Sequence, residues 1–224
     1  MPVSTADRLE TLNANLRATL PNGRIVAQPL PECGDITLGL IDPEFPTGPL
    51  PPDVMHAVIE RPAYWAFCWG SGLGLARMLF QHPEWVRGKS IIDLGSGSGV
   101  VAIAAARCGA ARVIACDNDP LALAATRANA ALNDAELVFA TDLDAIDTTA
   151  DLVLLADVLY DTINLPLVDR VVYRYRNVLV ADSRIRRLPG RRFRRIAEID
   201  ARTWPNLGEF DEFRTVRLFL TGQL

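Results

Sequence analysis

From residue 90 onward, short runs of valine, isoleucine and leucine alternate with stretches of helical character, and this alternation limits the possible folds more than any other feature of the chain. Buried apolar runs separated by helices are typical of βαβ units, in which a parallel sheet is covered by helices on both faces. We therefore expect strands near residues 90–94, 112–116, 136–140, 151–156 and 177–181, and helices near 99–108, 120–132 and 163–175.

The last quarter of the chain departs from this alternation. The segments RIAEIDA (195–201) and TVRLFLTG (215–222) have the character of two strands with no helix between them. Such a pair is expected to be antiparallel and to close an edge of the sheet. The sequence thus predicts an α/β fold: a Rossmann-like, doubly wound sheet of seven strands, mostly parallel, with an antiparallel C-terminal edge strand.

Two regions are predicted along the chain. Residues 1–62 form an N-terminal helix and a proline-rich arm, and residues 63–224 form the main domain. A capping box from Ser4 to Asp7, followed by leucines at spacings of three and four, predicts a one-faced amphipathic helix over residues 4–20. We expect this helix to pack on its own domain.

Prolines and glycines shape the next two segments. Dense prolines in residues 21–62 predict an irregular, extended arm that contains at most one short strand, DITLGLI. The segment GSGLG (70–74) contains a second glycine cluster, but no strand ending in an acid precedes it. We therefore interpret it as a backbone hinge before the helix LARMLFQ.

Composition narrows the functional classes. No apolar run is long enough to cross a membrane, and the first ten residues lack the basic and apolar regions of a secretory leader, so we expect a soluble, cytoplasmic protein. The 4 cysteines show no C-x-x-C spacing and only 2 histidines are available to join them, so no metal site is predicted. The net charge of -4 argues against general nucleic-acid binding.

A glycine loop, GSGSG (95–99), joins the first predicted strand of the sheet to an alanine-rich helix. In an open parallel sheet, the ligand site lies beyond the carboxyl ends of the strands, at such a loop. A dinucleotide fingerprint needs G-x-G-x-x-G, but position 100 is valine. Asp93 lies just before the loop, where a carboxylate would repel a pyrophosphate and attract a cation. A small ligand that carries an ammonium and a sulfonium group fits better.

Further acids follow the second and third strands. Asp117, at the end of RVIAC, is placed where a carboxylate accepts both hydroxyls of an adenosine ribose, which indicates a nucleoside ligand. Asp119 precedes Pro120, and this pair is better explained as a helix N-cap and first helical residue. Asp142 is a candidate acceptor for the adenine amino group, or else part of an ordinary acidic loop.

These residues resemble the glycine loop, preceding acid and ribose acid of the seven-strand S-adenosylmethionine-dependent methyltransferases. The resemblance implies S-adenosyl-L-methionine as cofactor and S-adenosyl-L-homocysteine as product. The residues expected to bind the cofactor are Trp69, Asp93, Gly95, Ser96, Gly97, Gly99, Asp117, Asn118, Asp142 and Ala156.

A narrower resemblance covers most of residues 28–182. The segments PAYWAFCWGSGLGLARML, VRGKSIIDLGSGSG, CDNDP and DLVLLADVLYD are similar to the family 16 lysine methyltransferases, most of all to those acting on the electron transfer flavoprotein β subunit. In that family an acid-x-x-Tyr motif follows the fourth strand, which implies catalytic roles for Asp157 and Tyr160. Trp69 matches the tryptophan that members of this family place beside the cofactor. The implied activity is protein-lysine N-methylation, with that β subunit as the candidate partner.

The chemistry of lysine methylation suits these residues. A carboxylate at Asp157 can bind the lysine ammonium and then hold the neutral amine, and Tyr160 can offer its ring and hydroxyl to the same pocket. One stretch departs from the relatives, which carry Gly-Asp-Pro-Gly-Arg after the fifth strand. Here the segment reads ADSRIRRLPGRRF, which keeps Asp182 and an arginine but loses that Pro-Gly. The identity of the methyl acceptor therefore stays open.

Other functions remain alternatives. The segment RIRRLPGRRFRR (184–195) is dense enough in arginine to contact phosphates, which would suit a nucleic-acid methyltransferase. Enzymes of that kind carry two prolines after the acid or asparagine of strand four, and DVLY lacks both. A small-molecule methyltransferase and a non-catalytic S-adenosylmethionine-binding module are the remaining alternatives. We expect a monomer with no membrane contact and no role for nucleic acid.

Overall fold

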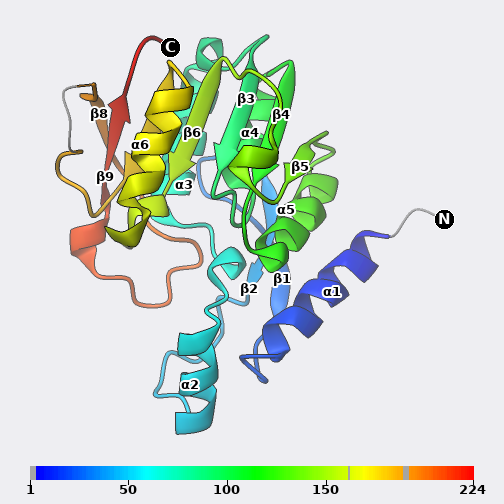
Figure 1. Ribbon diagram of the computed structural model, residues 1–224. Coiled ribbons are helices and arrows are strands. Elements are labelled where there is room, and N and C mark those ends of the chain that lie inside the picture. The colour runs from blue at the N-terminus through cyan, green and yellow to red at the C-terminus, as the bar shows by residue number, and fades with distance from the viewer. Residues whose placement is uncertain (1–3, 161, 189–191) are drawn as a thin grey trace.

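The computed structural model describes residues 4–160, 162–188 and 192–224 (Figure 1). A seven-stranded sheet runs through the described part, in the order β5-β4-β3-β6-β7-β9-β8. Its five parallel strands are β3 (Ser90–Leu94), β4 (Arg112–Cys116), β5 (Val138–Ala140), β6 (Leu152–Ala156) and β7 (Val178–Asp182). The strand order reverses beside β3, so the predicted doubly wound α/β fold is confirmed.

The two C-terminal strands are antiparallel, as expected, but they are arranged in an order that the sequence did not reveal. Strand β9 (Thr215–Leu220) lies between β7 and β8 (Arg194–Asp200), so the edge belongs to the earlier strand. The physical reason lies in their side chains. Strand β9 is mostly buried, whereas β8 is charged and largely accessible, and charged side chains protect an exposed edge from further pairing.

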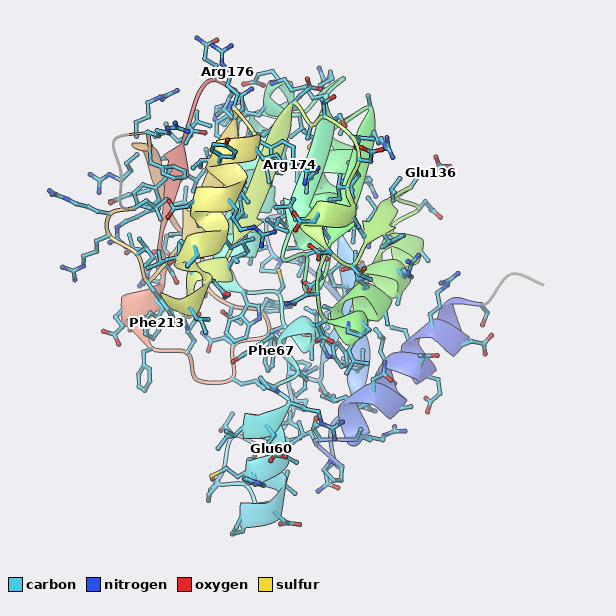
Figure 2. All side chains as sticks on the ribbon, viewed as in Figure 1. Glu60, Phe67, Glu136, Arg174, Arg176 and Phe213 are labelled. Atoms are coloured by element: carbon cyan, nitrogen blue, oxygen red, sulfur yellow. The ribbon has the colours of Figure 1, made fainter. Side chains whose placement is uncertain are left out.

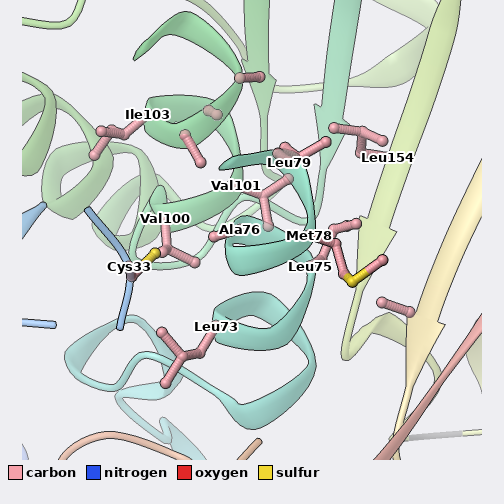
Figure 3. Close-up of a cluster of buried hydrophobic side chains, with 14 of the residues drawn as sticks. Cys33, Leu73, Leu75, Ala76, Met78, Leu79, Val100, Val101, Ile103 and Leu154 are labelled. Carbon is pink, nitrogen blue, oxygen red and sulfur yellow. The ribbon is translucent and has the colours of Figure 1, made fainter. Parts of the chain in front are cut away.

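Helices cover both faces of the sheet. Helices α3 (Gly70–Gln81) and α4 (Val100–Arg107) pack on one face, where Leu75, Leu79 and Ile103 are completely buried (Figure 3). Helix α6 (Leu165–Arg174) packs on the other face. Neighbouring strand residues alternate between the two faces, so Ile91 belongs to one core and Ile92 to the other.

The N-terminal helix forms as predicted. Helix α1 (Thr5–Arg17) begins with the expected capping box, because Ser4 and Asp7 exchange hydrogen bonds between side chain and backbone. Its buried face packs beside helix α5 (Pro120–Leu132), as Figure 1 shows. Leu12 and Leu16, each 1% exposed, share a core there with alanines of α5.

The prediction for residues 21–62 was right about the short strand and wrong about the rest of the segment. The predicted strand DITLGLI forms β2 (Thr37–Ile41), but β2 pairs with a second strand, β1 (Ile25–Pro29), in a hairpin, and a helix, α2 (Pro52–Glu60), follows. Prolines do not prevent these elements from forming, because the prolines lie at the ends of the strand and the helix, where the missing amide hydrogen costs little. Pro29 ends β1, and Pro52 begins α2.

The predicted hinge at residues 70–74 was also wrong. This glycine cluster forms the first turns of α3 itself. A Cβ atom at Gly74 would lie 2.8 Å from Ile199 Cδ1, so glycine is needed for close approach rather than for bending. The helix thereby packs directly against β8.

Within residues 4–160, 162–188 and 192–224, every helix is too short or too polar to span a lipid bilayer. In the same ranges, histidines, cysteines and acids do not gather into a group of three that would suit a metal ion.

Candidate active site

A cavity of about 630 Å³ opens at the carboxyl ends of the parallel strands, beside the point where the strand order reverses. Open α/β sheets bind their ligands at this position. In Figure 2, Phe67 and Phe213 lie at this end of the molecule, and Arg176 lies at the opposite end. The predicted site residues that line the cavity are Trp69, Gly95, Gly97, Asp117, Asn118, Asp142, Ala156 and Asp157.

The glycine loop lies between the end of β3 and the start of α4. Gly97 lines the cavity, and a Cβ atom there would meet no protein atom within 4 Å. Gly99 precedes α4 with φ of 85°, and its Cβ atom would lie 2.8 Å from Thr126 Cγ2 of α5. Glycine at position 99 therefore allows both the left-handed backbone and the close contact with α5.

Asp117 follows β4 and turns toward the glycine loop. Its Oδ2 atom accepts a hydrogen bond from the Gly97 amide at 2.9 Å, and its Oδ1 atom accepts one from the Asp119 amide at 3.0 Å. Burial raises the pKa of the Asp117 carboxyl, while these backbone amides act in the opposite direction. Two carboxylate oxygens offer about four acceptor sites, so Asp117 keeps the capacity to bind ligand hydroxyl groups.

Asp119 caps helix α5, as expected. Its carboxylate accepts a hydrogen bond from the Leu121 amide at 2.8 Å, although the residue also lines the cavity. Asp142 similarly accepts a hydrogen bond from the Asp144 amide at 3.0 Å, in the short turn η3 (Leu143–Ala145). Asp142 is exposed at the cavity, so its capping role and the predicted ligand contact are compatible.

Three predicted residues support the loop without lining the cavity. Asp93 is only 1% exposed, and its Oδ2 atom accepts a hydrogen bond from the Ala102 amide in α4 at 3.0 Å. Burial raises the pKa of the Asp93 carboxyl to about 7. The Ser96 hydroxyl lies 3.2 Å from Thr126 Oγ1. Gly99 is the third of these residues. Together they attach the loop to α4 and α5.

Asp157 follows β6 and lines the cavity with a left-handed backbone, at φ of 52°. Its Oδ1 atom accepts a hydrogen bond from Ser71 Oγ at 2.5 Å, and its Oδ2 atom accepts one from the Ser71 amide at 2.8 Å. Burial, with a smaller contribution from Asp182, raises the pKa of the Asp157 carboxyl to about 6. Sequence analysis gave Ser71 no role in the site, because it lies 86 residues from Asp157 in the GSGLG segment, which we interpreted as a hinge.

Tyr160 and Trp69 are the remaining predicted residues. Tyr160 ends the turn η4 (Val158–Tyr160), but its side chain lies outside the described part of the structure. Trp69 immediately precedes α3, and its Nε1 atom donates a hydrogen bond to the Tyr64 carbonyl at 2.8 Å. The Phe67 ring lies 5.5 Å from the Trp69 ring, measured between centroids. These contacts hold the indole at the cavity wall.

The cavity is rich in carboxylates. Among the described residues, four aspartates line it, against two arginines, Arg170 and Arg184, and Arg170 already pairs with Asp144 at 2.7 Å. The Arg184 guanidinium lies 4.6 Å from the centre of the Phe213 ring. Sequence analysis did not assign either arginine to the site. Excess negative charge inside a concave site favours a cationic ligand over a phosphate-bearing one.

Comparison with known sequences gives partial matches. A family model described as ribosomal protein L11 methyltransferase (PrmA) matches residues 79–176. The electron transfer flavoprotein beta subunit lysine methyltransferases of Homo sapiens and Danio rerio are 44% and 46% identical to the chain over 101 residues. This match covers 44% of the chain and 38% and 39% of those relatives, so the chain spans about two fifths of their length.

Solved structures share the fold. The ribosomal protein L11 methylase from Lactobacillus delbrueckii subsp. bulgaricus matches with a TM-score of 0.51 and 22% identity, over 68% of this chain and 80% of that chain. A 16S rRNA methyltransferase (RsmC) from T. Thermophilus matches with a TM-score of 0.55 and 15% identity, over 90% of this chain and 51% of that chain. The expected fold and the expected resemblance to the flavoprotein lysine methyltransferases are thus confirmed.

Proposed function

We propose that this chain is an S-adenosylmethionine-dependent methyltransferase that acts on a lysine side chain of a protein. The observation that carries the proposal is one cavity that holds both the glycine loop with Asp117 and the carboxylate of Asp157. Support also comes from relatives that are 44% and 46% identical and are named as protein lysine methyltransferases.

The residues present suit the proposed cofactor. A cavity of about 630 Å³ lies within the range of pockets for ligands of this size, and its carboxylates suit a cation. In this proposal Asp117 binds the ribose hydroxyls, Asp142 accepts from the adenine amino group, and Trp69 packs beside the ligand. Gly95 and Gly97 allow the backbone to approach it closely. When bound, S-adenosylmethionine supplies a methyl group activated by a positively charged sulfur.

The chain's own residues then have to bind and align the amine. A pKa of about 6 leaves the Asp157 carboxyl ionised at neutral pH, so it attracts the ammonium group of a lysine. After the ammonium has released one proton to solvent water, the same carboxylate accepts a hydrogen bond from the neutral amine and keeps the nitrogen lone pair directed into the cavity. Tyr160 remains a predicted partner in this step. Positioning of this kind accounts for several kcal/mol of a typical barrier.

The proposed partner is a protein such as the electron transfer flavoprotein β subunit, which the names of the relatives indicate. The segment of residues 181–193 departs from those relatives, and Arg184 of this segment lines the cavity. We therefore expect the substrate-facing side to differ from theirs. The monomeric state and the cytoplasmic location expected from the sequence stay predictions.

The test is methylation of a cell lysate with isotopically labelled S-adenosylmethionine, followed by protease or nuclease treatment. We expect label that protease removes and nuclease does not, on a lysine that mass spectrometry identifies. The Asp157→Asn variant should bind the cofactor in calorimetry yet transfer no methyl group. Label that only nuclease removes would favour the nucleic-acid alternative, and cofactor binding without any transfer would favour the binding module.

A further inference from the structure

Helix α3 begins near the carboxyl ends of the parallel strands, and its first amides donate hydrogen bonds to side chains from two segments that are distant in the sequence. The Gly70 amide donates to Thr203 Oγ1 at 3.2 Å, in the loop between β8 and β9. The amides of Ser71 and Gly72 donate to the Asp157 carboxylate at 2.8 Å and 3.3 Å. The first amide of α3 therefore binds Thr203, outside the cavity lining, and the next two amides bind Asp157, which lines the cavity.

The side chain of Ser71 adds a third bond to Asp157. Its hydroxyl lies 2.5 Å from Asp157 Oδ1, and Ser71 is completely buried at 0% exposure, so water does not compete for this bond. Asp157 also has a positive φ of 52°, which is uncommon for any residue other than glycine. Its bonds to α3 therefore determine where the carboxylate points.

We propose that Ser71 is a positioning residue for the methyl acceptor: its hydroxyl, together with the positive end of α3, keeps the Asp157 carboxylate charged and directed into the cavity. This inference rests on the proposed function, in which that carboxylate binds the acceptor amine. Hydrogen bonds to the charged form of a carboxyl group favour that form, and so does the N-terminus of a helix.

The charged groups around Asp157 explain why the serine matters. Burial and the neighbouring carboxylate of Asp182 raise the pKa of Asp157. The hydrogen bond from Ser71 and the positive charge of Arg184 both lower this pKa, and the hydrogen bond has the larger effect. The Cys68 thiol also faces Asp157, and burial raises its own pKa well above the ordinary value, so it stays neutral. Ser71 is thus the strongest of the groups that favour the ionised carboxylate.

The first measurement is a carbon-13 NMR titration of the Asp157 carboxyl, assigned by its loss in Asp157→Asn. We expect the pKa to rise by about one pH unit in Ser71→Ala, as loss of one hydrogen bond to a charged group predicts. The matched control is Thr203→Val, which removes another buried hydroxyl from the same end of α3 without touching Asp157. An unchanged pKa in Ser71→Ala, or an equal rise in Thr203→Val, would overturn the inference.

The second measurement uses the protein acceptor identified from the lysate. In Ser71→Ala we expect the acid limb of kcat/KM to move about one pH unit toward alkaline pH, with unchanged calorimetric affinity for S-adenosylmethionine. Should Ser71→Ala be too unstable to assay, Ser71→Cys carries the same prediction, because the thiol leaves no cavity and is a much weaker hydrogen-bond donor than the hydroxyl. A wild-type chain that titrates as expected but transfers no methyl group would instead refute the proposed function.

Discussion

Two acids beside the glycine loop differ in what their carboxylates contact. Asp93 lies inside β3, so the alternation of strand side chains directs it to the α4 face, where the Ala102 amide donates to it. Asp117 follows the last residue of β4 and is free to turn toward the cavity. Asp93 lies one residue before the end of β3 and Asp117 lies one residue after the end of β4, so two positions of strand register separate a carboxyl group that supports the loop from one that can contact a ligand.

Replacing Asp117 tests its proposed contact with the ribose. We expect Asp117→Ala to weaken S-adenosylmethionine binding by about 1.5 to 3 kcal/mol, because charged hydrogen bonds to the ligand are lost. Isothermal titration calorimetry measures the change. Asp119→Asn is the control, since asparagine also caps helices and should leave the affinity unchanged. Equal affinities for Asp117→Ala and the wild type would remove Asp117 from the site.

The buried Asp93 carboxyl predicts a pH dependence of stability. Burial raises its pKa from 3.8 to about 7 in the folded chain, so the unfolded chain releases this proton first as the pH rises. Stability should therefore fall between about pH 4 and pH 7, by a contribution on the order of 4 kcal/mol. Urea unfolding should show a shallower fall in Asp93→Asn. Parallel pH profiles for the two proteins would contradict the prediction.

At the scale of elements, helix α5 connects the N-terminal hairpin to the glycine loop. The buried side chain of Asn129 accepts a hydrogen bond from the Gly39 amide in β2 at 2.7 Å and donates one to the Ser98 carbonyl at 2.8 Å. Asn133 makes a similar pair of bonds with the backbone of Thr37. The hairpin and the loop therefore share one buried set of amide contacts.

Removing the Asn129 amide should destabilise the fold. We expect Asn129→Ala to cost about 2 to 5 kcal/mol of unfolding free energy, because two buried backbone groups lose their partners. Asn177→Ala is the matched control. Asn177 also bridges two backbone groups, at Asp151 and Gln223, but these bonds lie at the exposed surface where water can replace the side chain. Similar losses in the two variants would show that burial is not the cause.

The two N-terminal helices should differ in their contribution to stability. Leu16 of α1 is 1% exposed and packs on α5, so Leu16→Ala should cost about 2 to 5 kcal/mol. Ile59 of α2 is 70% exposed, so Ile59→Ala should change stability by less than about 0.5 kcal/mol. Chemical denaturation measures both. A large loss in Ile59→Ala would mean that α2 has a partner in the folded protein.

At the scale of the whole molecule, the division between residues 1–62 and 63–224 remains a prediction. The contacts of α1 and β2 with α5 favour one cooperative unit across that boundary. We expect calorimetry to record a single unfolding transition whose calorimetric and van't Hoff enthalpies agree. Two separated transitions would contradict this expectation and would support independent folding of the two regions.

Sequence patterns predicted the parts of the molecule that depend on local chemistry. The alternation of apolar runs and helices identified the five parallel strands, and the strand-loop-helix pattern identified Asp117 and the glycine loop at the cavity. Strand β1 and helix α2 were missed because proline density was taken as evidence against regular structure, whereas these prolines lie at element ends. The place of β9 within the sheet was missed because strand order leaves no local signal.

By itself, the sequence determined the five parallel strands and the turn at residues 95–99 that needs glycine, because periodicity and backbone sterics act over a few neighbouring residues. Only the tertiary structure decided which groups meet. Ser71 and Asp157 lie 86 residues apart, and Gly70 and Thr203 lie 133 apart. Their contacts depend on how α3 packs across the sheet, and that packing results from many weak apolar contacts that no short segment encodes.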